Sequence, residues 1–137
     1  MDAAGLAISL ITLCEKLYKG IKTIKNAPED IKRLAAELEM LEAILQSVKS
    51  TLDGKLLISL EKMEEQMRVC LERLKNLDVN VNAKQGIKAR VKRIVGRVTW
   101  PWKEDELLQS INLIERLKND LMIELQVHQV YVRSQHI

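Results

Sequence analysis

The two histidines and the two cysteines are the residues of this chain best suited to bind a metal or to do nucleophilic chemistry. His128 and His136 are eight positions apart, whereas two zinc ligands on one helix face stand at i and i+4. Cys14 and Cys70 match no metal or redox spacing, and both fall on predicted buried helix faces as free thiols. We therefore expect no metal, no cofactor and two solvent-exposed histidines.

Other catalytic patterns are equally missing from the sequence. The five glycines are scattered and form neither a phosphate-binding loop nor a dinucleotide fingerprint. Ser9, Ser47 and Ser59 fall within predicted helices with no base placed to activate them. Clustered acids such as Glu64-Glu65 are better explained as solvated faces and helix starts. No catalytic residue is predicted, and the protein is not expected to be an enzyme.

The protein is therefore expected to act by binding through its surfaces. One candidate surface is a basic stretch with no acidic residue between positions 84 and 103. Its apolar spacing predicts an amphipathic helix from Lys84 to about Thr99, ended by Trp100-Pro101-Trp102, which is either an interfacial or a structural turn. Such a helix suits an anionic membrane surface or a partner protein, and a solvated face is the plain alternative. Nucleic acid is not expected, because no aromatics interleave with the basic residues. The candidate lipid-binding residues are Lys84, Lys88, Arg90, Lys92, Arg93 and Arg97.

The second candidate is the N-terminal helix, predicted from about Asp2 to Lys25. Between Ala3 and Cys14 it is apolar nearly all round, whereas a surface helix needs one apolar stripe. Such a segment is expected either at the centre of a bundle or in lipid. We expect the resting bundle to hide the five large aliphatic side chains that are also the candidates for membrane insertion: Leu6, Ile8, Leu10, Ile11 and Leu13.

These segments must be positioned by other helices. Aromatics are only 3% of the chain and Phe is absent, which disfavours strands. Apolar heptads predict helices from Pro28 to Leu52, over residues 60–77, and from about Glu104 to the end of the chain. The turn at Asp53-Gly54 predicts that the two helices flanking it pack as antiparallel neighbours. We expect a single all-α domain over residues 1–137, an antiparallel four- to five-helix bundle with an apolar N-terminal helix. With no secretory signal and no run long enough to span a bilayer, we expect a cytoplasmic protein.

Three segments together resemble the N-terminal domains of fungal STAND proteins, the NOD-like receptors, in the HeLo-like group of helical bundles. The first is the apolar start, Gly5 to Ile11 followed by Leu17-Tyr18. The second is Ala27-Pro28-Glu29-Asp30-Ile31 leading into the heptads. The third is Trp100-Pro101-Trp102 followed by the last helix. The likeness covers essentially the whole chain, and its weight lies in the order of the three segments.

This resemblance implies an effector domain for regulated cell death or innate immunity, including heterokaryon incompatibility, at the head of a receptor with a downstream nucleotide-binding domain. It implies self-association on activation, followed by relocation to the plasma membrane and disruption of the bilayer through the N-terminal helix, with anionic lipids as partners. The alternative is an interaction module that pairs with itself or with a signalling partner and never touches lipid.

Overall fold

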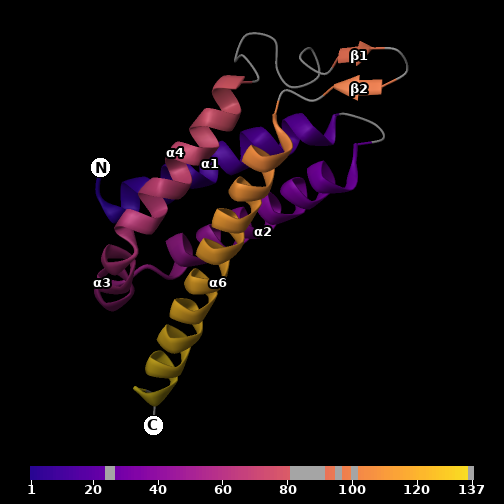
Figure 1. The fold of residues 1–137 in the computed structure, drawn as a ribbon. Helices are drawn as coiled ribbons and strands as arrows, with labels where there is room; N and C mark the ends of the chain where they lie inside the picture. The colour runs from indigo at the N-terminus through magenta and orange to yellow at the C-terminus, as the bar shows by residue number, and fades with distance from the viewer. Residues whose placement is uncertain (24–26, 81–91, 95–96, 100–101, 136–137) are drawn as a thin grey trace.

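The computed structural model describes residues 1–23, 27–80, 92–94, 97–99 and 102–135. Five helices run through this part of the chain, and a short two-stranded ribbon precedes the last of them (Figure 1). Their bounds are α1 Ala3–Lys22, α2 Glu29–Thr51, α3 Gly54–Lys62, α4 Glu64–Asn80, β1 Lys92–Ile94, β2 Arg97–Thr99 and α6 Glu104–Ser134. The all-α class is confirmed, because helices supply the whole core apart from Met63 and Trp102.

The four long helices enclose one hydrophobic core. α1 packs against α2 and α4, and α6 packs against the same two helices, so α1 and α6 are diagonal to each other and so are α2 and α4. The prediction that the helices flanking Asp53-Gly54 would pack as antiparallel neighbours is therefore wrong. The neighbours of α2 are α1 and α6, because all four heptad seams converge on one centre rather than pairing along the chain.

The helix ends follow local chemistry. The Asp2 carboxylate accepts a hydrogen bond from the Gly5 N–H at 2.7 Å and caps α1. Asp53 caps α3 in the same way, accepting from the Leu56 N–H at 2.9 Å. Pro28 precedes the first turn of α2, which carries two acids at the positive end of the helix. The starts predicted at Asp2, Pro28 and Glu104 are confirmed to within one residue.

The heptads over residues 60–77 do not form one helix. The chain breaks at Met63, whose φ of −100° and ψ of 6° end α3, and α4 begins at the next residue. Met63 is itself buried, so the break turns the chain without interrupting the apolar seam. The two acids that follow stabilise the new N-terminus.

The predicted basic helix over residues 84–99 is wrong for the residues that the structure describes there. β1 and β2 pair antiparallel with Lys92 opposite Thr99 and Ile94 opposite Arg97. The sequence offers a reason, because Ile94, Val98 and Thr99 are β-branched and Gly96 stands between the strands. Residues 84–91 lie outside the described part of the chain.

Among the described residues, none of the helices combines the length and apolar character needed to cross a bilayer. The last turns of α6 extend beyond the other helices (Figure 1). They carry exposed apolar side chains, including Val127 and Val130.

Candidate functional site

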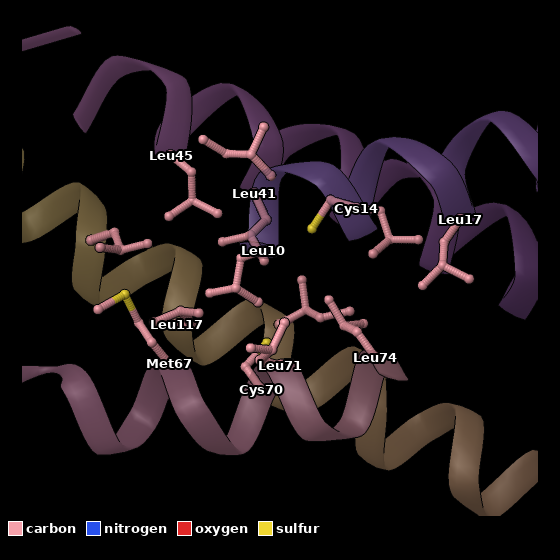
Figure 2. Close-up of a cluster of buried hydrophobic side chains, with 14 of the residues drawn as sticks. Leu10, Cys14, Leu17, Leu41, Leu45, Met67, Cys70, Leu71, Leu74 and Leu117 are labelled. Atoms are coloured by element: carbon pink, nitrogen blue, oxygen red, sulfur yellow. The ribbon is translucent and has the colours of Figure 1, made fainter. Parts of the chain in front are cut away.

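α1 is a surface helix with one buried face. Its buried seam recurs at intervals of four and three residues, the pattern of a helix packed on one side. Leu10, Cys14 and Leu17 extend from α1 into the core, to which Leu41 of α2 and Met67 and Leu74 of α4 also contribute (Figure 2). The expectation that this segment lies either at the centre of the bundle or in lipid is therefore wrong as regards the bundle, because α1 is not at its centre. The full buried seam consists of Ala3, Leu6, Ala7, Leu10, Ile11, Cys14, Leu17 and Ile21.

The five candidates for membrane insertion divide between the two faces of α1. Leu6, Leu10 and Ile11 are buried, with 2%, 0% and 7% of their surface exposed, and Leu13 is half-buried against the core. Ile8 is 50% exposed. The expectation that the resting bundle hides all five is wrong for Ile8, because position 8 falls between the seam positions 7 and 10 and faces solvent.

Over the first three turns of α1 the outer face is made mainly of small residues. A Cβ atom added to Gly5 would lie 2.8 Å from the Met1 Cγ, so the exposed Met1 side chain would have to shift to admit a larger residue there. The Ser9 hydroxyl lies 3.4 Å from the Met1 sulfur, to which it donates a weak hydrogen bond. The Thr12 hydroxyl donates to the Ile8 carbonyl within the helix at 3.1 Å. Only Ile8 places a large apolar side chain on this face.

Polar contacts attach α1 to the bundle far more weakly than they attach α6. In the part of the chain that the structure describes, the one polar side-chain contact from α1 to another helix is the 3.0 Å ion pair between Lys16 and Asp78 of α4. The Lys16 side chain is half exposed, and such pairs contribute little to stability. α1 is held almost entirely by apolar packing.

α6, by contrast, is linked by polar side-chain contacts to α2, α3 and α4. Two ion pairs join it to α2, Arg33–Glu115 at 3.1 Å and Glu37–Lys118 at 2.9 Å. A hydrogen bond from Gln66 to Asp120 at 2.9 Å joins it to α4, and His128 contacts the cap of α3. Release of α1 would therefore leave the remaining helices connected.

The two thiols lie in the core between α1 and α4 (Figure 2). Burial raises the pKa of Cys70 to about 12. Burial, and then the nearby Cys70 and Glu42, raise the pKa of Cys14 well above its ordinary value. Both predicted free, buried cysteines are confirmed, and neither thiolate is accessible for chemistry in this state.

The basic candidates are only partly described. Lys92, Arg93 and Arg97 lie in the ribbon of β1 and β2, whereas the other three, Lys84, Lys88 and Arg90, lie outside the described residues. Trp100 and Pro101 also lie outside them.

Trp102 lies at one end of the bundle core. It is 6% exposed, and its indole N–H donates to the Leu77 carbonyl of α4 at 2.9 Å. It thereby fixes the start of α6 against the end of α4. Sequence reasoning left its role open between an interfacial and a structural turn; in this state it is a core residue.

The expectation of exposed histidines is wrong for His128. It is 7% exposed, and its Nε2 lies 3.1 Å from Asp53 Oδ2 at the start of α3. The pair joins residues 75 positions apart in the chain, so no local pattern could have indicated it. His136 lies outside the described residues. Within the described residues, no group of three or more His, Cys, Asp or Glu side chains could hold a metal ion.

Comparison with known proteins gives one family. The family described as SesA, the N-terminal domain on NACHT NTPases and P-loop NTPases, matches residues 4–127. No curated protein matches the chain significantly, and no solved structure does. The match includes α1, all the core helices and most of α6.

Proposed function

Because the chain belongs to the SesA family of N-terminal domains on NACHT and P-loop NTPases, we propose that it is the effector domain of a fungal NOD-like receptor, without catalytic activity. In this proposal the downstream nucleotide-binding domain gathers several copies in the cytoplasm. The assembled copies release α1 at the plasma membrane, perturb the bilayer and trigger regulated cell death.

The observation that carries the proposal is the way α1 is held. Apolar packing fixes it, with a single half-exposed ion pair, Lys16–Asp78, to another helix in the described part of the chain. An apolar environment can replace that packing, whereas water cannot. Lipid acyl chains or neighbouring copies provide such an environment.

The magnitudes explain why the resting domain stays closed. Burying a large aliphatic side chain stabilises the fold by about 1.5–3 kcal/mol. Exposing the five large aliphatic seam residues to water would therefore cost roughly 8–15 kcal/mol, comparable to the whole stability of a domain. Release thus requires a compensating apolar surface. The five are Leu6, Leu10, Ile11, Leu17 and Ile21.

The dimensions of α1 favour insertion into one leaflet. The uncharged segment from Ala3 to Cys14 would measure about 18 Å as a helix, close to half of a hydrocarbon core of about 30 Å. Lys16, Lys19 and Lys22 follow it and would remain at the phosphate level. The basic residues of the ribbon would add about 1 kcal/mol each on an anionic surface.

The test uses a substitution that the resting fold tolerates. Ile8→Glu places a charge on the exposed face of α1, so the bundle should remain folded, but a carboxylate would enter the lipid upon insertion. Ile58→Glu is the matched control, because Ile58 of α3 is similarly exposed, at 57% against 50%. We expect leakage of anionic liposomes on forced oligomerisation to be lost in Ile8→Glu and retained in Ile58→Glu. Leakage that persists in folded Ile8→Glu refutes insertion of α1.

A second candidate function, an interaction module without membrane activity, is favoured by the outer face of α6. Ile123, Val127 and Val130 stand at helical spacing and are 55%, 57% and 64% exposed. They lie opposite the buried seam of α6, where Leu121 and His128 point inward. This alternative predicts concentration-dependent assembly in solution, weakened by Val127→Lys, and no flotation with anionic liposomes at low or high salt.

A further inference from the structure

A groove between α4 and α6 combines unpaired positive charge with hydrogen-bonding side chains. Arg73 of α4 and Gln109, Asn112, Leu113 and Arg116 of α6 line a cavity of about 270 Å³. It lies on a different pair of helices from α1 and takes no part in the proposed release of α1.

The two arginines of this groove differ from Arg68 of α4 and from Arg33 of α2, which are paired. Arg68 pairs with Glu64 and Glu65, and Arg33 pairs with Glu115. Arg73 and Arg116 form no ion pair within the residues that the structure describes. Arg73 is also half-buried, and it lines the groove.

The lining suits a carboxylate carried on a peptide. A guanidinium presents parallel N–H donors that match the two oxygens of a carboxylate. The Gln109 and Asn112 side-chain amides both donate and accept, as a peptide backbone requires. Leu113, half-buried in the groove, offers an apolar contact.

The borders of the groove offer a polyanion little further positive charge. Next to Arg73, Glu65 and Glu72 of α4 pair with Arg68 and Lys75, and next to Arg116 lie Glu115, which pairs with Arg33, and Asp120. A bilayer or a nucleic acid would bring many negative charges against a surface whose neighbouring cations are already paired, whereas a short segment needs only the two arginines of the groove. We propose that this groove binds a short acidic segment of a partner protein, with Arg73 and Arg116 pairing with its carboxylates.

The test measures binding of a labelled hexapeptide of alternating glutamate and alanine by fluorescence anisotropy at low salt. We expect saturable binding that is weakened at least tenfold by Arg73→Gln and by Arg116→Gln. Arg68→Gln is the matched control, and it should change the affinity less than twofold because Arg68 is already paired on the same helix. Arg116→Lys should recover only part of the affinity, since an ammonium cannot form the paired hydrogen bonds.

Three results would overturn the proposal. One is no binding at millimolar peptide. Another is equal weakening by Arg68→Gln, which would indicate a diffuse charge effect. The third is displacement by inorganic phosphate or anionic vesicles at the same charge concentration, which would indicate a simple anion or membrane site. Circular dichroism verifies that each variant is folded.

Discussion

The exposure of Cys14 should report how firmly α1 is held. Leu10 is fully buried at the centre of the α1 seam, and Ile8 is half exposed on the same helix. Truncating Leu10 to alanine removes core contacts and leaves a cavity, which costs about 3–5 kcal/mol at a fully buried leucine. Truncating Ile8 removes side-chain atoms that water already covers in part, and should cost well under 1 kcal/mol.

The assay is thiol labelling of Cys14 under native conditions in a Cys70→Ala background. Because Cys14 is buried by the packing of α1, labelling requires α1 to separate from the core or the domain to unfold. A cost of about 3 kcal/mol raises the open population about a hundredfold, since each 1.4 kcal/mol is a factor of ten. We expect Leu10→Ala to accelerate labelling by about that factor and Ile8→Ala by less than threefold.

Two outcomes would refute this reasoning. If Ile8→Ala accelerates labelling as much as Leu10→Ala, the division of α1 into a buried and an exposed face is incorrect. If Leu10→Ala changes the rate less than threefold, the packing of Leu10 does not hold α1 closed. Both rates must be compared at a pH where the thiol reacts equally fast in the unfolded chain.

Three further outcomes are expected. Lys118→Met should lower the free energy of unfolding measured with urea by about 2–4 kcal/mol, because it leaves the buried Glu37 carboxylate unpaired. Replacing both Lys118 and Glu37 by Met should be nearly neutral. Equal losses in the two variants would contradict this expectation. Because burial raises the pKa of Cys14 and Cys70, the stability they contribute is present below the unfolded pKa of about 8.5 and is lost as the pH rises above it. The free energy of unfolding measured with urea should therefore fall between pH 8 and pH 10, by up to about 1.4 kcal/mol per pH unit for each thiol, and should not fall this way in a Cys14→Ala/Cys70→Ala variant. Trp102→Phe should cost about 1 kcal/mol by losing the indole hydrogen bond to α4, measured by thermal unfolding, and an unchanged midpoint would contradict that bond.

The helices were predictable because their signals are local and repeated. The α2 heptad fixes a face by alternating steps of three and four, and its positions from Ile31 to Val48 are buried. The ribbon of β1 and β2 was missed because its apolar spacing fits a helix, while its β-branched residues favour strands and Gly96 disfavours a helix. The break at Met63 was missed because the heptad continues across it.

The candidate site was predictable in outline, but its faces were not. The apolar character of α1 identified the helix, but the number of apolar residues alone does not show which face is buried. The buried face follows from the spacing of Ala3, Ala7, Leu10 and Cys14 at steps of four and three. That spacing was present in the sequence and places Ile8 outside. The contacts of His128 and Trp102 depend on residues distant in the chain, and only the packed structure brings them together.

The small residues of the outer face bear on whether α1 could enter lipid at all. A helix leaving a protein core for a bilayer must place every side chain, including its former solvent face, among acyl chains. Between Ala3 and Cys14 no side chain is charged, and the Thr12 hydroxyl already donates to the Ile8 carbonyl within the helix, which reduces the cost of its transfer. Gly5 and Ser9 add little polar surface. The face of α1 that is exposed to water therefore carries few polar groups, so its transfer into lipid costs little free energy. A charge added at Ile8 would make that transfer costly.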